Sequence, residues 1–251
     1  MNRLIVLLVL LGTALVGHAG EEQPCPPGAL NSLKTELNVE YLVASACKVL
    51  PDDQDTLLAS AVIKADGDFE DSYQWRVMLL EAHNYEIKAR FESRIDTGDA
   101  TTRVDSGMIW LDTARYHVAD DNRAFGVRLA SGNWPRYAQG GRDLFLTLFS
   151  GTPQHGQLVP LVDHLPLYVW QEISADYQAN HFTREIAEGY INVLPTSSHS
   201  LRDLQLVYPT VIESYDGETT TRPNRRLTMT LKFNGAEYPF DEWQDVPGED
   251  W

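Results

Sequence analysis

Aromatic residues close to an arginine give this sequence its clearest capacity for recognition. Trp134, Arg136 and Tyr137 lie in one glycine-containing loop, and Tyr168 and Trp170 follow the central hairpin expected at 142–165. Trp, Tyr and Arg side chains dominate the binding energy of protein interfaces, and aromatic rings also stack on sugars. The alternative is that these rings end strands and cover the core. We interpret these aromatic residues and Arg136 as candidate binding residues.

Known patterns of catalytic sites are not found. The sequence lacks the Gly-x-Ser-x-Gly of hydrolases, the His-Glu-x-x-His of zinc enzymes and a glycine-rich phosphate loop. His155 and His164 are the two histidines close enough to meet across the central hairpin, but Asp163 suits a turn equally well. With 36 acidic residues, the sequence does not single out a glycosidase pair. We therefore expect no catalytic residue and no cofactor, and an enzyme is the less favoured class.

An acidic run at 66–71 is the only segment with the character of a calcium loop, because its carboxylates alternate. Asp71 stands where the EF-hand pattern needs glycine, and Val77 stands where it needs a bidentate glutamate. This run therefore favours a solvated hairpin loop, and we expect no metal site.

The first residues have the composition of a secretory signal. Arg3 precedes an apolar run at 4–16, and the small residues Gly17 and Ala19 suit a signal peptidase. The run of about 13 residues is shorter than the roughly 20 that a membrane span needs. The sequence predicts a cleaved signal peptide at 1–19 and a periplasmic or secreted protein that has no membrane contact after cleavage.

The two cysteines, Cys25 and Cys47, both lie near the start of the mature chain. In an oxidising compartment such a pair predicts one disulfide, which would staple the segment 20–50. A redox role is disfavoured because there is no Cys-x-x-Cys motif. A metal site is disfavoured because no histidine accompanies either cysteine at ligand spacing.

Acidic residues strongly outnumber basic ones. The chain has 36 acidic and 20 basic residues, and its net charge is −16. Removing Arg3 with the signal leaves 19 basic residues and a charge of −17. Such an excess repels nucleic acid and anionic membranes, which excludes both as partners. Solubility alone would explain the charge, and a basic protein partner is the alternative.

Alternating apolar residues predict three successive units, each a lead strand followed by a hairpin. Their lead strands start 20, 20 and 23 residues before their hairpins. The units are 55–64 with 75–92, 123–130 with 143–165, and 202–209 with 225–240. Further strands precede them at 41–49, 107–118 and 185–194.

The sequence also predicts the third hairpin's turn and the helical segments. The third hairpin is expected to turn at Asn234-Gly235, after a polar loop through Pro223 and Asn224. The spacing of Leu30, Leu33 and Leu37 predicts a short helix at 28–38, and a helical turn is tolerated at 174–188.

These patterns predict an all-β protein of antiparallel meanders with a short N-terminal helix, its hairpin domain covering 51–251. The repeated units allow a sandwich or a propeller-like arrangement. Closed propellers need about 4 to 8 blades, so three units favour packed sheets. Hairpins recur in any all-β protein, so the alternative is that the units are not true repeats.

The strand pairs RAFGVRLA and DLFLTLF, followed by GQLVPLVD, resemble those of uncharacterised exported bacterial all-β proteins. The resemblance covers roughly 47–240 and implies a periplasmic setting, with no activity and no functional residue. We expect an exported, non-catalytic binding protein, inhibitor-like or immunity-like, whose acidic surface meets a basic envelope protein. The alternatives are an envelope protein that binds or hydrolyses carbohydrate, with a glycan as its partner, and a purely structural envelope component.

Overall fold

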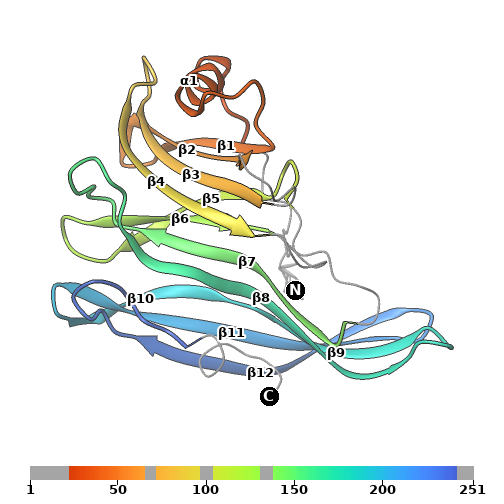
Figure 1. Cartoon of the computed structure of the whole chain (residues 1–251). Helices are drawn as coiled ribbons and strands as arrows, with labels where there is room; N and C mark the ends of the chain where they lie inside the picture. Colours follow the sequence, from red (N-terminus) through yellow and green to blue (C-terminus); the bar gives the residue numbers. More distant parts are fainter. Residues whose placement is uncertain (1–22, 66–71, 97–103, 131–137, 242–251) are drawn as a thin grey trace, which may run out of the picture.

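The computed structural model describes residues 23–65, 72–96, 104–130 and 138–241 (Figure 1). The predicted signal peptide lies outside them. Over the described residues the chain forms one helix, α1 (Pro27–Leu37), and strands in antiparallel pairs. The strands are β1 (Ala44–Leu50), β2 (Asp53–Lys64), β3 (Ser72–Glu81), β4 (Ile87–Asp96), β5 (Ile109–His117), β6 (Arg123–Leu129), β7 (Gly140–Phe149), β8 (Pro160–Asp176), β9 (His181–Glu188), β10 (Tyr190–Ser198), β11 (Leu201–Tyr215) and β12 (Thr219–Leu231).

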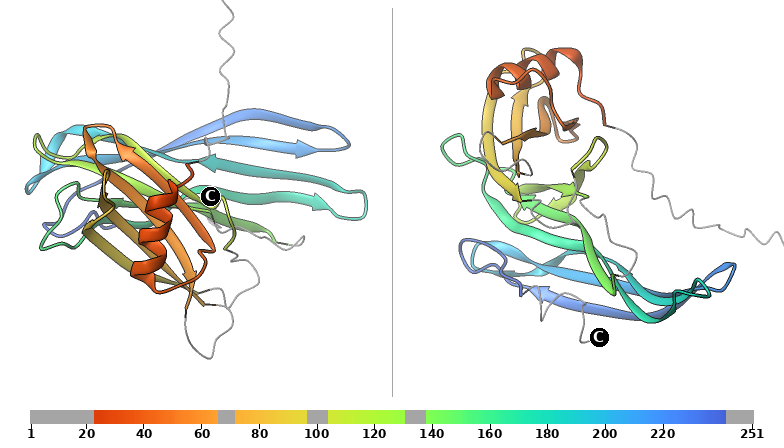
Figure 2. Two further views of the ribbon diagram at one scale, coloured as in Figure 1. Left: turned by 90° about the horizontal axis from the view of Figure 1, so that it is seen from above. Right: turned by 45° about the vertical axis from the view of Figure 1, so that its right-hand side comes forward.

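Two antiparallel sheets contain these strands. The smaller sheet has the order β1-β2-β3-β4. The larger has the order β10-β11-β9-β8-β7-β6-β5, with β12 added beside β11. Figure 2 shows that the larger sheet curls into half of a barrel, while the smaller sheet lies against one part of it.

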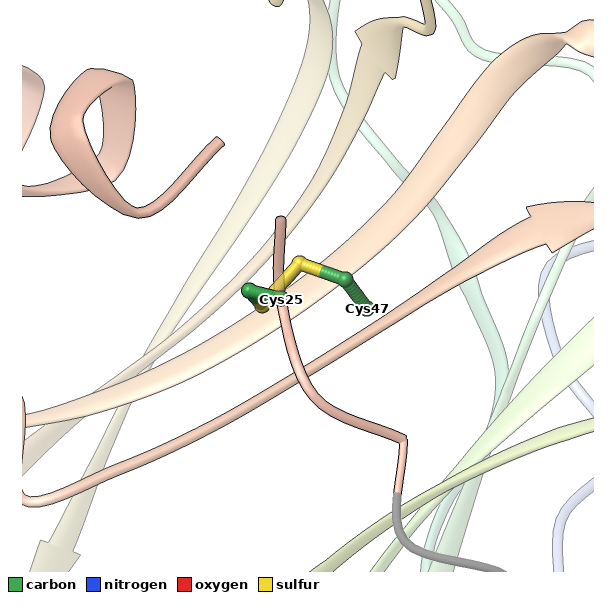
Figure 3. Close-up of a disulfide and its surroundings, with 2 residues drawn as sticks. All are labelled: Cys25 and Cys47. Atoms are coloured by element: carbon green, nitrogen blue, oxygen red, sulfur yellow. A yellow bond between two sulfur atoms is a disulfide. The ribbon is translucent and has the colours of Figure 1, made fainter. Parts of the chain in front are cut away.

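Helix α1 covers the outer face of the smaller sheet. Its buried residues Ala29 and Leu33 pack with Ala59, Ala61 and other small apolar side chains of that sheet. Beside this cluster, Cys25 and Cys47 form a disulfide with their Cα atoms 4.6 Å apart (Figure 3). The disulfide therefore fixes the segment before α1 to β1.

Strands β6 and β7 separate two cores. Phe125 and Phe149 are register partners whose rings stack at 5.6 Å, and they pack against the smaller sheet. Leu146 and Leu148 point to the other side of β7, where they join Tyr208 of β11. Since side chains alternate between the faces of a strand, this stretch is apolar on both sides.

The curl of the larger sheet encloses the second core. The backbone N–H of Arg202, at the start of β11, donates to the carbonyl oxygen of Val118, just after β5, at 2.7 Å. Later in the chain, the Tyr238 N–H donates to the Leu161 carbonyl oxygen, also at 2.7 Å. The first bond joins segments near opposite ends of the larger sheet, and the second joins the segment after β12 to β8 in the middle of that sheet.

The structure confirms the all-β class, the short N-terminal helix and the Cys25–Cys47 disulfide. The packed sheets agree with the sandwich expectation more closely than with the propeller-like one. The first two predicted units are present as the meanders β1-β2-β3-β4 and β5-β6-β7-β8. The residues of the predicted N-terminal segment share the first of these sheets with β2, β3 and β4.

The third unit differs from the prediction. Its hairpin is β11–β12, which turns at 216–218, and β12 continues through Pro223 and Asn224, where a polar loop was expected. The turn at Asn234-Gly235 follows β12, the last described strand, and therefore does not connect two described strands of a hairpin. Proline is tolerated in β12 because an edge strand needs no ladder bond on its outer side. The segment 174–188, where the sequence allows a helical turn, forms the β-hairpin between the end of β8 and β9.

Replacing both cysteines by serine, Cys25→Ser with Cys47→Ser, should lower the free energy of unfolding by about 3 kcal/mol. The reason is that the disulfide closes a loop across a sequence separation of 22 and restricts the unfolded chain. Urea denaturation followed by tryptophan fluorescence measures the change. The wild type in reducing buffer is the control and should match the variant, and equal midpoints for oxidised wild type and variant would contradict the prediction.

Candidate functional site

Two hairpins project beyond the rest of the molecule side by side (Figures 1 and 2). One is formed by the end of β8 with β9, at 168–188, and the other by the end of β11 with β12, at 209–226. Strands β9 and β11 pair with each other, which joins the two hairpins into one sheet. We call this four-stranded projection the arm.

One face of the arm carries aromatic and charged side chains from neighbouring strands. Trp170 pairs with Ile186 in the strand register, and Tyr215 pairs with Phe182. Arg184 pairs with Glu213 in the same way. Register partners lie on the same face of a sheet, and every second residue of a strand returns to it. We call this side the arm face; its main residues are Tyr168, Trp170, Phe182, Arg184, Glu213 and Tyr215.

Arg184 is the centre of the arm face. Its guanidinium carbon lies 5.7 Å from the ring centroid of Trp170 and 5.2 Å from that of Phe182. Its Nη2 is 2.6 Å from Glu213 Oε1, and its Nε donates to the same oxygen at 2.8 Å. A cation over aromatic rings and paired with a carboxylate holds these side chains in a fixed arrangement.

Aromatic side chains continue to the tip of the arm. The rings of Phe182 and Tyr215 are stacked with an interplanar angle of 16° and centroids 5.6 Å apart. In the turn after β8, the hydroxyl of the exposed Tyr177 donates to Glu172 Oε2 at 2.5 Å. Ile173 is also exposed, at 57%. The tip therefore presents apolar surface that does not belong to either core.

The surroundings of Tyr168 show that the arm face is acidic. Burial raises the pKa of the Tyr168 phenol, Arg184 opposes this shift, and the carboxylates of Glu213, Glu188 and Asp143 add to it. Asp143 and Glu188 are the register partners of Tyr168 on β7 and β9. Three carboxylates therefore lie near the Tyr168 phenol, and one of them, Glu213, pairs with Arg184.

The structure brings two of the sequence-predicted residues to the arm face. Tyr168 is half-buried there, and Trp170 is only 9% exposed, so its ring supports Arg184 more than it offers a free surface. Trp134, Arg136 and Tyr137 lie outside the described residues.

Sequence reasoning missed four residues of the arm face. Phe182 and Arg184 lie in the segment where the sequence tolerates a helical turn, and Glu213 and Tyr215 lie where it predicts a polar loop. The signal that finds them is the two-residue period in FTREIAE and VIESY, where every second residue belongs to this face.

The opposite side of the arm contains a buried ion pair. Glu185 is 7% exposed, and its Oε1 accepts hydrogen bonds from Thr210 Oγ1 at 2.6 Å and Asn224 Nδ2 at 2.7 Å. Arg225 donates to both carboxylate oxygens of Glu185, at 3.0 Å each. The strand register shifts here, between Pro209 and Val211. The network therefore holds β12 to β9 across β11, at the base of the arm.

His164 and Asp163 form a polar cluster on β8. Asp163 Oδ1 is 2.6 Å from His164 Nδ1 and accepts a hydrogen bond from Thr147 Oγ1 at 3.1 Å. In a catalytic triad the hydroxyl bonds to the imidazole, whereas here it bonds to the carboxylate. Thr147 Oγ1 also accepts the backbone N–H of His164, which has a φ of 52°. The cluster thus stabilises an irregular stretch of β8 where the register shifts.

A cavity of about 480 Å³ lies where the N-terminal segment meets β1 and β5. Met108, Trp110 and Leu144 contribute to its wall together with Arg128. Arg128 Nε donates to Asp112 Oδ2 at 3.0 Å, and its guanidinium carbon lies 5.2 Å from the Trp110 ring centroid. Asp112 balances the arginine charge, and the wall of the cavity is polar and apolar in nearly equal parts, so it shows no preference for one class of ligand.

Metal ligands do not gather in the described parts of the chain: no three histidine, cysteine or acidic side chains there are placed to share an ion. Within the same residues, no helix is long and apolar enough to cross a membrane. Neither a family model, nor a curated protein, nor a solved structure matches this chain. Two packed antiparallel sheets with a projecting arm define it as an all-β protein, and its function has to be argued from its own residues.

The variant Glu185→Gln should lower the free energy of unfolding by about 1 to 3 kcal/mol at pH 7, because Arg225 loses its charged partner. Burial alone would raise the pKa of Glu185, but the hydrogen bonds from Arg225, Thr210 and Asn224 outweigh it and bring that pKa below the ordinary glutamate value. Urea denaturation over a pH series measures the difference between variant and wild type.

The expected sign follows from the lowered pKa in the folded state. The stabilisation by Glu185 is complete above the unfolded value of about 4.3 and is lost as the pH falls through the folded-state pKa. The gap between wild type and Glu185→Gln should therefore close below about pH 4. The variant Glu237→Gln, at an exposed turn, is the control and should change little. A gap that widens on acidification would contradict the assignment.

Proposed function

We propose that this chain is an exported, non-catalytic binding protein that engages a basic protein partner of the cell envelope through the arm face. The observation that carries the proposal is the arm face itself, where Arg184 is set among aromatic rings and carboxylates on a projecting sheet. An inhibitor-like or immunity-like role is the form of binding that this surface suits best.

Export is supported by sequence and structure together. The first residues have the charge and apolar pattern of a secretory signal. The Cys25–Cys47 disulfide is of the kind that an oxidising compartment, such as the periplasm or the extracellular space, maintains.

The charge of the arm face supports a basic partner. Glu188 is exposed, and Asp143 and Glu213 add negative charge around Tyr168. A lysine or arginine of a partner would meet an acidic surface beside the rings of Phe182 and Tyr215, which favours both electrostatic attraction and cation–π contact. The net charge of −16 would also steer a basic protein toward the chain.

A carbohydrate ligand is the second candidate. The stacked rings of Phe182 and Tyr215 favour it, because flat aromatic surfaces beside carboxylates also suit sugar rings. Glu213 is held in its ion pair with Arg184, so binding is a better description than hydrolysis for this candidate. A glycan array separates the two candidates.

The double variant Tyr215→Ala with Glu188→Lys should reduce the capture of basic envelope proteins by about tenfold, because it removes a ring and reverses an exposed charge of the arm face. The measurement is a pull-down from an envelope extract with immobilised wild type and variant, quantified by mass spectrometry over a salt series. Capture by the wild type should weaken as salt rises.

The matched control is Tyr41→Ala with Glu40→Lys, which removes an exposed ring and reverses an exposed charge between α1 and β1, away from the arm. It should capture as the wild type does. Equal losses in both double variants would show an effect of net charge and contradict the arm face as the site. Binding of a defined sugar on the array, with salt-independent affinity and no protein capture, would favour the carbohydrate candidate instead.

A further inference from the structure

Most sheet edges in the described part of the chain are covered by another segment. At β5, the side chain of Gln23 accepts the backbone N–H of Leu111 at 2.8 Å and donates to the Leu111 carbonyl oxygen at 3.2 Å. The Gln23 carbonyl oxygen also accepts the N–H of Cys47 in β1, at 2.9 Å. One residue thus satisfies backbone groups on the edges of both sheets.

The edge of β4 has a similar cover. The Arg90 N–H donates to the Gly156 carbonyl oxygen at 3.1 Å, and the Leu158 N–H donates to the Arg90 carbonyl oxygen at 2.9 Å. The segment between β7 and β8 therefore lies along β4. Unpaired edges invite association with other chains, and natural proteins cover them in this way.

Two edge strands lack such a cover within the described residues: β10, which pairs only with β11, and the longer β12. All its strand pairing, from Thr219 to Leu231, is with β11 on one side. No backbone hydrogen bond between described residues joins its other side to any segment. Since every second N–H and C=O of a strand points away from a given neighbour, β12 carries a row of backbone groups that have no strand partner among the described residues. In Figure 1 it forms the outermost strand of the larger sheet.

The second half of β12 has side chains suited to strand pairing. Leu227 and Met229 are half-buried, whereas Thr228 and Thr230 between them are exposed. This alternation keeps one face on the protein and leaves threonine, a residue favourable in strands, on the other. An incoming strand would thus meet a regular edge.

The first half of β12 is basic and would favour a partner segment of negative charge. Arg222, Arg225 and Arg226 are the cluster of basic residues in an acidic chain. Arg225 is paired with Glu185, but Arg222 is exposed, and Arg226 donates to the neutral hydroxyl of Tyr190 at 2.5 Å. Two copies pairing antiparallel about this cluster would bring the arginines of both copies together, which disfavours self-association.

We propose that β12 accepts an extended acidic segment of a partner protein as an added strand, with backbone bonds along 227–231 and ion pairs to Arg222 and Arg226. In strand addition, the main-chain bonds give affinity and the side chains give specificity. This surface is distinct from the arm face and has the opposite charge, so it would bind a second partner, or a second part of the same one.

The test uses three fluorescent undecapeptides, long enough to span 222–231, and the full-length exported protein. The acidic probe is Glu-Val-Thr-Val-Thr-Val-Thr-Val-Thr-Val-Glu with blocked ends. The second probe has lysine in place of both glutamates, and the third is the acidic peptide with N-methyl groups on alternate residues. Fluorescence anisotropy should show binding of the acidic probe. It should show at least about tenfold weaker binding of the other two, because one reverses the charge and the other removes main-chain donors.

Two further measurements locate the site. The acidic probe should slow amide hydrogen exchange within 227–231. The variant Arg222→Glu should weaken its binding by about fivefold or more, whereas Arg115→Glu, at an exposed position on β5, should leave the binding unchanged. Arg222→Glu keeps the arm face intact, so this result stands apart from the test of the arm face.

Several outcomes would overturn the proposal. These are no binding of the acidic probe, binding that N-methylation does not weaken, or equal effects of Arg222→Glu and Arg115→Glu. Protection of amides elsewhere would also overturn it, because it would place the peptide on another surface. Concentration-dependent dimers in analytical ultracentrifugation with β12 amides protected would assign the edge to a second copy of this chain instead.

Discussion

Burial of both faces of β6 and β7 is the constraint on which the rest of the structure depends. Phe125 and Phe149 need the smaller sheet as a cover, and Leu146 and Leu148 need the curled part of the larger sheet. A glycine, Gly126, lies between them, where an added Cβ would come within 2.6 Å of Leu146 Cδ1. The two cores thus share one wall, and each sheet takes its place by covering one side of it.

The sequence predicted those strands and the helix whose pattern of apolar residues can be recognised within a single short segment. The meanders around 55–64 and 123–130 alternate or run apolar between clear turns, and the period of Leu30, Leu33 and Leu37 marks the helix. The prediction of the third unit was wrong because its longest strands, β11 and β12, form the arm and the sheet edge, where polar residues are exposed. Pro223 and Asn224 are typical of loops, yet β12 tolerates them at the point where the register of the β11–β12 pair shifts.

The candidate site was harder to predict than the fold because it depends on pairing between distant strands. Tyr168 was recognised from its residue type alone. Arg184 and Glu213 become partners only when β9 and β11 lie side by side, and β11 extends well past the stretch where a strand was expected. The sequence shows which residues of each strand are charged, but it does not show which strands will pair with each other.

Neighbouring residues of β9 build two opposite electrostatic environments. Arg184 faces the aromatic side of the arm and pairs with Glu213, whereas Glu185 faces the other side and pairs with Arg225. The alternation of a strand is enough to send the two charges to opposite faces. Each face therefore keeps its own partner, and the thin arm holds charged groups on both sides without a hydrophobic layer between them.

The double attachment of Gln23 affects how the molecule would respond to mechanical load. Its side chain is bonded to β5 and its carbonyl oxygen to β1, and Cys25, two residues later, is covalently tied to β1. A pull on the chain ahead of Gln23 would first strain these hydrogen bonds and then reach the disulfide. Tension from that direction would thus end at a covalent bond at the junction of the sheets, and helix α1, beyond that bond, would be spared.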